Sequence, residues 1–118
     1  MEFKLDEFIR SYVSAALEVA KSGHEFDKFF DTIEERVTKD TGFPRDFVRH
    51  IHHSFHWTFF CDRETIVQKV ESRKKGQNDS IRLRREYTEK DIDELTKEII
   101  AKQGPYVLER ARRYHQQA

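Results

Sequence analysis

Histidines are the most concentrated group of potentially reactive side chains in this 118-residue chain. His52 and His56 stand four residues apart, a spacing that places two imidazoles on one face of a helix. Two imidazoles supply half of a closed zinc site, but Cys61 is the only cysteine that could add a thiolate. We therefore predict no metal site, and interpret the histidines as a surface that gains charge on acidification.

Nucleotide chemistry is disfavoured on similar grounds. Glycine-rich loops cradle phosphates through consecutive backbone N–H groups. The four glycines of this chain are isolated from one another, and each suits a helix end or a turn. We expect no small-molecule cofactor.

An arginine followed five residues later by a histidine occurs twice, as Arg45/His50 and Arg110/His115. This spacing resembles the short motif of HEPN-type helical ribonucleases. The resemblance implies a dimeric site, where the cation stabilises charge developing on a phosphate and the imidazole moves a proton. A HEPN-like ribonuclease is the leading enzyme hypothesis, ranked below two non-catalytic alternatives.

A glycine between two apolar helical segments occurs at Thr41-Gly42, with Val37 before it and Phe43, Val48 and Ile51 after it. Residues 34–56 resemble a helix-turn-helix DNA-binding unit. The resemblance implies that the helix opening at Pro44 is the recognition helix. The side chains that would then reach base edges or phosphates are Arg45, Arg49, His50 and His53.

Positive charge is concentrated in the second half of the chain. Residues 1–62 carry 8 Lys/Arg against 12 Asp/Glu, whereas residues 63–118 carry 14 against 10, so that the total is zero. Residues 73–85 form the densest basic run and contain one acid, Asp79. We predict that this run contacts phosphates, as the wing of the helix-turn-helix unit, through Arg73, Lys74, Lys75, Arg82, Arg84 and Arg85.

Apolar periodicity predicts the helices that position these residues. A first helix runs from Leu5 to Gly23, a second from Phe26 to Thr41-Gly42, and a third opens at Pro44. Thr88 and Asp91 have the spacing of an N-cap and its reciprocal partner, so another helix begins there. It is predicted to stop at Gly104-Pro105, before a last basic helix over 106–118.

Residues 62–87 fit two structures. Ile66, Val67 and Val70 could prolong the third helix or begin a strand, while residues 80–84 alternate with a period of two. We therefore expect a single mainly α domain over 1–118, a small bundle of four to five helices with a basic β-hairpin at about 65–87 as an alternative to a loop. The predicted core consists of Phe8, Tyr12, Phe30, Ile33, Val48, Ile51, Phe55, Leu95 and Ile99.

Taken together, the residues favour a small non-catalytic accessory or regulatory protein that binds nucleic acid. DNA is one candidate partner, and a protein partner or self-association is expected as well. Its size and composition resemble those of small phage or mobile-element proteins. The alternative is an assembly module that forms a homo-oligomer through oppositely charged faces. The N-terminus shows no signal core and no apolar run spans a bilayer, so we expect a cytoplasmic protein without membrane contact.

Overall fold

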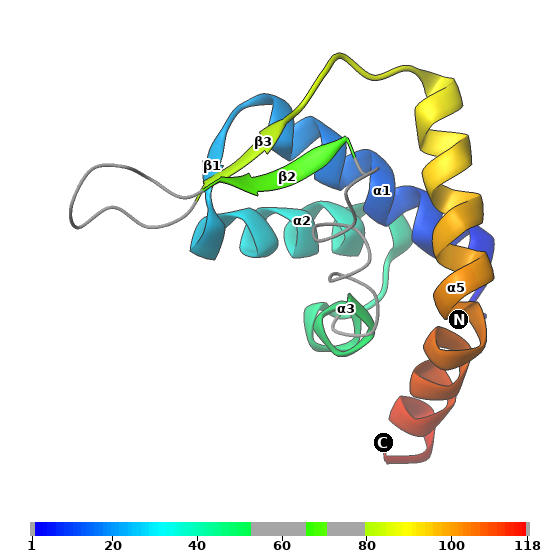
Figure 1. The fold of residues 1–118 in the computed structure, drawn as a ribbon. Helices are drawn as coiled ribbons and strands as arrows, with labels where there is room; N and C mark the ends of the chain where they lie inside the picture. The colour runs from blue at the N-terminus through cyan, green and yellow to red at the C-terminus, as the bar shows by residue number, and fades with distance from the viewer. Residues whose placement is uncertain (1, 53–65, 71–79, 118) are drawn as a thin grey trace.

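The computed structural model describes residues 2–52, 66–70 and 80–117, and Figure 1 shows a small sheet beside the N-terminal helices. The predicted mainly helical class with a small hairpin is confirmed. The elements in chain order are α1 (Leu5–Lys21), β1 (His24–Glu25), α2 (Phe26–Thr41), α3 (Arg45–His52), β2 (Val67–Val70), β3 (Ser80–Leu83) and α5 (Glu89–Gln117).

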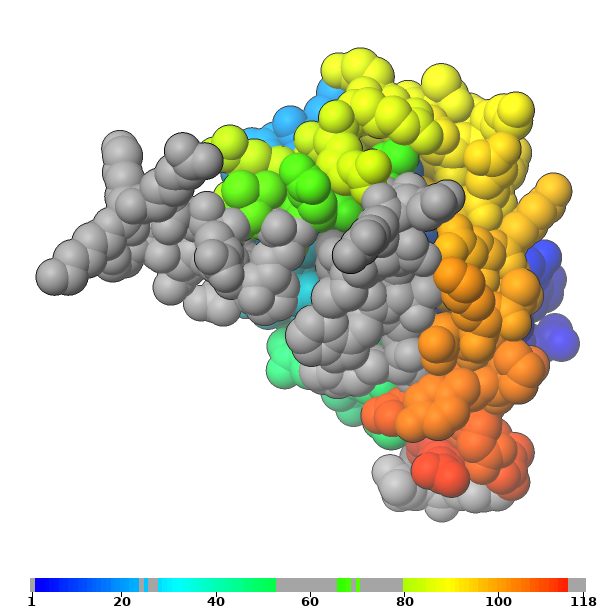
Figure 2. All heavy atoms as spheres, in the orientation of Figure 1, coloured from blue at the N-terminus to red at the C-terminus, as the bar shows by residue number. Residues whose placement is uncertain are grey.

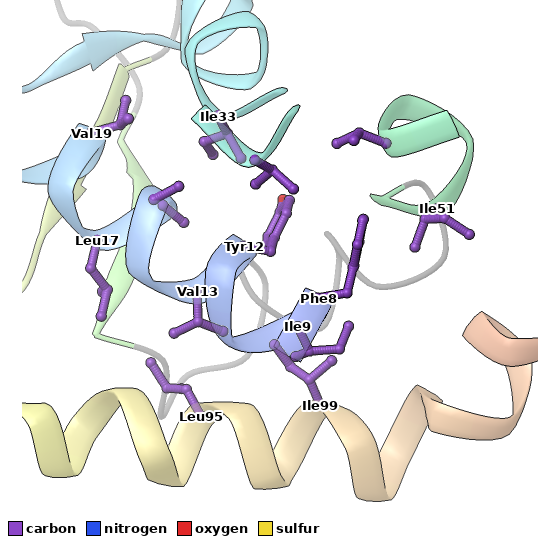
Figure 3. Close-up of a cluster of buried hydrophobic side chains, with 14 of the residues drawn as sticks. Phe8, Ile9, Tyr12, Val13, Leu17, Val19, Ile33, Ile51, Leu95 and Ile99 are labelled. Atoms are coloured by element: carbon purple, nitrogen blue, oxygen red, sulfur yellow. The ribbon is translucent and has the colours of Figure 1, made fainter. Parts of the chain in front are cut away.

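Helix α1 is the centre of the core because it is apolar on two faces. Figure 3 shows Ile9 and Val13 directed toward Leu95 and Ile99 of α5, while Tyr12 points toward α2. Each large apolar side chain buried in this way contributes about 1.5–3 kcal/mol relative to exposure. Of the predicted core residues, Phe30 is only partly buried and Phe55 lies outside the described residues, while the other seven are buried.

A tight connection joins α2 to α3, and its geometry follows from Gly42. This residue caps α2 in the left-handed region at φ 80°, where a side chain would be strained, and its N–H donates to the Thr38 oxygen at 2.8 Å. Phe43 and Val48 then bury their side chains in the core together with Val37 and Ile51. The predicted glycine stop and the start of the third helix at Pro44-Arg45 are confirmed.

The sheet is three-stranded and antiparallel, with the order β1-β3-β2. Gln68 pairs with Arg82 and Val67 with Leu83, which confirms the hairpin for the residues that the structure describes. Ile81 and Val67 are buried on one face, whereas Gln68 and Arg82 are exposed on the other. The strand β1 was not predicted, because two residues are too few to show a period.

The predicted start of α5 is confirmed atom by atom. The backbone N–H of Thr88 donates to Asp91 Oδ2 at 2.8 Å, and the Asp91 N–H lies 3.4 Å from Thr88 Oγ1. These are the two reciprocal hydrogen bonds of a capping box. They satisfy backbone donors that the first turn of a helix leaves without partners.

The predicted stop at Gly104-Pro105 is wrong, because α5 continues through both residues to Gln117. Gly104 is buried and helical rather than left-handed, and a Cβ there would lie 3.4 Å from Leu5 Cδ2. Beyond Pro105, Val107 and Ala111 are buried, and this packing offsets the backbone hydrogen bond that proline cannot make. The predicted last basic helix is therefore the C-terminal half of α5, and it leans toward α3 (Figure 1).

No helix in the described part of the chain combines the length and apolar character needed to cross a bilayer.

Candidate nucleic-acid interface

The two arginines predicted on the recognition helix project from α3 toward carboxylates of α2. Arg45 Nε donates to Glu34 Oε2 at 3.2 Å, and its Nη2 donates to Asp31 Oδ1 at 3.0 Å. Its Nη1 lies 3.6 Å from Glu35 Oε1. Arg49 lies one turn further along α3 and reaches the same group, with Nη2 at 3.0 Å from Glu34 Oε2. The arginines are thus held in ion pairs within the chain.

Glu34 is the shared partner, and its side chain is only 2% exposed. The ring of His52 is also buried, and its Nδ1 lies 3.3 Å from Glu34 Oε1. This ring stacks on Phe30 at a centroid distance of 5.3 Å. Burial, together with the Glu34 charge, raises the pKa of Tyr12 above its ordinary value. A buried carboxylate of this kind persists only when it is paired, which is the role of the two arginines.

His52 is therefore a core residue rather than a surface ligand. His56, which stands four residues after it, lies outside the described residues. In the parts of the chain that the structure describes, no group of three or more His, Cys, Asp or Glu side chains could hold a metal ion.

His50 faces the C-terminal half of α5 instead of the arginines. Its Nε2 lies 3.2 Å from the Arg110 main-chain oxygen, and Arg110 Nε donates to the His50 main-chain oxygen at 3.1 Å. One turn away, the Tyr114 hydroxyl donates to Asp46 Oδ2 at 2.9 Å. Arg45 and His50, the first pair of the ribonuclease-like spacing, thus engage different partners. This flank of α3 is covered by α5.

The basic residues of the hairpin lie in a different environment. Arg82 lies on the outer face of the sheet, opposite Gln68, and Arg84 follows β3 by one residue, with its N–H donating to the Ile66 oxygen at 2.7 Å. The side chains of Arg82, Arg84 and Gln68 are exposed. Figure 2 shows β3 and the residues that follow it on the upper surface of the molecule. None of the ion pairs within the described residues involves Arg82.

A shallow depression of about 470 Å³ lies beside this face, where the end of α1 meets β3. Lys21 and Arg82 bring two cations to its lining, together with Ser22 and one acid, Glu86. Positive charge at the end of α1 therefore adjoins that of the hairpin.

Arg85 is a capping residue rather than a free surface cation. Its Nη1 and Nη2 donate to the two oxygens of Asp91 at 3.1 and 2.7 Å. This bidentate pair holds the pKa of Asp91 below its ordinary value of 3.8, and the Thr88 N–H adds to the effect. The remaining predicted site residues lie outside the described residues; they are His53, Arg73, Lys74 and Lys75.

Sequence reasoning missed the carboxylates that hold the α3 arginines. Asp31, Glu34 and Glu35 recur at the three- and four-residue spacing that places side chains on one side of a helix. That spacing was visible in the sequence. What periodicity could not show is that this side of α2 meets α3 across the turn at Gly42.

Comparisons with known proteins returned no match, since no family model, curated protein or solved structure is significantly similar to the chain.

Proposed function

We propose that this chain is a small non-catalytic nucleic-acid-binding protein of the winged helix-turn-helix kind, and that it contacts duplex DNA through the outer face of the β2–β3 hairpin. The observation that carries the proposal is the exposed pair Arg82 and Arg84, two residues apart at the C-terminal end of β3. Guanidinium groups in this arrangement suit successive phosphate contacts along a backbone.

The order of elements supports the same function. A helix-turn-helix pair, α2 and α3, is followed by the β2–β3 hairpin, and β1 completes the sheet beside β3. The residues at which the two helices of such a unit pack, Val37, Phe43, Val48 and Ile51, are all buried. The order along the chain, a helix pair followed by a hairpin, is the order of elements in a winged helix-turn-helix unit.

Charge reversal tests the proposal. Arg82→Glu/Arg84→Glu should weaken binding to a short mixed-sequence duplex about tenfold or more at low salt, because repulsion replaces two phosphate contacts. The matched control is Lys97→Glu/Lys102→Glu, which makes the same change in net charge on exposed residues of α5. Equal losses in both double variants would show a general charge effect and would contradict a site on the hairpin.

A second function, self-association, is favoured by one observation on α5. Tyr106 and Leu108 are the large hydrophobic side chains most exposed in the described part of the chain, at 54% and 47%. Arg112 and Arg113 follow them on the same helix. Tyr106→Ser/Leu108→Ser should abolish a homo-oligomer held by this segment. Light scattering measures the mass of both proteins: an oligomeric wild type with a monomeric variant favours self-association, and equal masses contradict an interface at this segment.

A further inference from the structure

The contacts of Arg45 and Arg49 divide into an inner and an outer set. Glu34 accepts from Nε of both arginines, and this carboxylate is almost fully buried. Asp31 and Glu35 instead contact the terminal nitrogens of Arg45 and are 61% and 68% exposed. The inner contacts hold both guanidinium groups against a buried carboxylate, while the outer contacts join terminal nitrogens to exposed carboxylates.

The inner and outer contacts differ in how easily another acceptor, such as water or a phosphate oxygen, can replace the carboxylate. The buried contacts of Glu34 cannot be replaced by water without leaving a charge unpaired in the core. Exposed ion pairs are weak, because water and salt compete for both charges. A phosphate oxygen offers the same kind of acceptor as a carboxylate and carries negative charge, so it can take the place of Asp31 or Glu35 on Arg45.

We infer that Asp31 and Glu35 compete with DNA phosphates for the α3 arginines, and that Glu34 keeps Arg45 and Arg49 oriented while this exchange takes place. The inference rests on the proposed function and adds α3 to the hairpin as a second contact surface. The two exposed carboxylates then set the affinity of the α3 surface and keep it low in the free protein.

Arg45 and Arg49 remain partly exposed while they pair with Glu34. Their side chains are 41% and 54% exposed although each contacts a buried carboxylate. Neutralising Glu34 does not require Asp31 or Glu35, because exposed ion pairs contribute little to folding stability. Asp31 nevertheless lies within ion-pair distance of both arginines, at 3.0 Å from Arg45 Nη2 and 3.8 Å from Arg49 Nη2.

The experiment measures the affinity of the full chain for a short mixed-sequence duplex at low salt. Asp31→Asn/Glu35→Gln should bind about threefold to tenfold more tightly than wild type, because the two competing carboxylates and their three weak ion pairs are removed. Glu94→Gln/Glu98→Gln is the control, since it makes the same change in net charge on the N-terminal half of α5. Asp31→Asn alone should produce a smaller gain.

The outcomes separate the inference from the function on which it rests. A gain confined to Asp31→Asn/Glu35→Gln supports the competition. Equal gains in both double variants, or no gain in either, overturn the competition while leaving binding through the hairpin intact. Absence of duplex binding by wild type and by all variants overturns the proposed function and the competition together.

Discussion

Arg49 of α3 donates to both carboxylate oxygens of Glu34 of α2, from Nε at 3.2 Å to each and from Nη2 at 3.0 Å to Oε2. The hydrogen bonds to Glu34, together with the charge of this residue, raise the pKa of Arg49 above its ordinary value. Through Glu34, α2 and α3 are joined by ionic contacts as well as by apolar packing. The contribution of this carboxylate to stability can be measured directly.

Glu34→Gln should lower the free energy of unfolding by about 1–3 kcal/mol, because charge-assisted hydrogen bonds to a buried group are lost. Asp31→Asn, which changes an exposed member of the same cluster, should cost less than about 1 kcal/mol. Urea denaturation of both variants provides the comparison. Equal losses in the free energy of unfolding would contradict a special contribution from the buried Glu34 and its contacts with Arg45, Arg49 and His52.

The Asp91 cap predicts a pH dependence of stability. Its folded-state pKa is below 3.8, so the carboxylate stabilises the protein above that pH, and the contribution is lost as pH falls through the folded-state value. Asp91→Asn should therefore be less stable than wild type by about 1 kcal/mol at neutral pH. Urea denaturation along an acid series should show this difference shrinking below pH 3.8. A difference that is constant with pH would contradict the ionic character of the cap.

Tyr114 attaches the end of α5 to α3. Its ring lies 4.9 Å from that of Phe47, and its hydroxyl donates to Asp46. Tyr114→Ala should destabilise the protein by about 1–2 kcal/mol, since an aromatic contact and a hydrogen bond are lost together. Tyr114→Phe keeps the ring and should cost less than about 1 kcal/mol. Hydrogen exchange should speed up over residues 106–114 in the alanine variant alone, and unchanged exchange there would rule out this attachment.

Gly104 and Gly42 should respond to alanine with opposite signs. At Gly104 a Cβ would make ordinary contacts, 3.4 Å to Leu5 and 3.5 Å to Ile100, so Gly104→Ala should stabilise α5 by about 0.5–1 kcal/mol. At Gly42 the left-handed φ of 80° strains alanine, and Gly42→Ala should destabilise by about 1 kcal/mol or more. Thermal unfolding of both variants checks the signs. Destabilisation at Gly104 would show that α1 and α5 leave no room for a methyl group.

The sequence predicts most of the helical framework because the signals there are local. Gly42 ends α2 and the Thr88–Asp91 pair opens α5 through contacts within a few residues, and both predictions are confirmed. The continuation of α5 past Gly104-Pro105 depends on packing against α1 and α3, which no local pattern contains. Local chemistry therefore predicted the wrong end for this helix.

The candidate site is predicted less completely for the same reason. Alternation along 80–84 predicts a strand there, and the structure has β3 over Ser80–Leu83, with Arg82 exposed in it and Arg84 exposed one residue after its end. The pairing of Arg45 and Arg49 with Asp31 and Glu34 connects residues 11 to 18 positions apart, and it depends on the angle between α2 and α3. That angle becomes known only with the fold.

The most direct test of the central claim is the salt dependence of duplex binding, followed by light scattering so that mass and affinity are measured together. For wild type, the logarithm of the binding constant should fall linearly with the logarithm of salt concentration, at constant protein oligomeric state. Arg82→Gln/Arg84→Gln should reduce the slope by about 0.9 for each lost phosphate contact, close to two in total. An unchanged slope in that variant, or a protein that changes its own mass with salt and does not bind the duplex, would contradict the account.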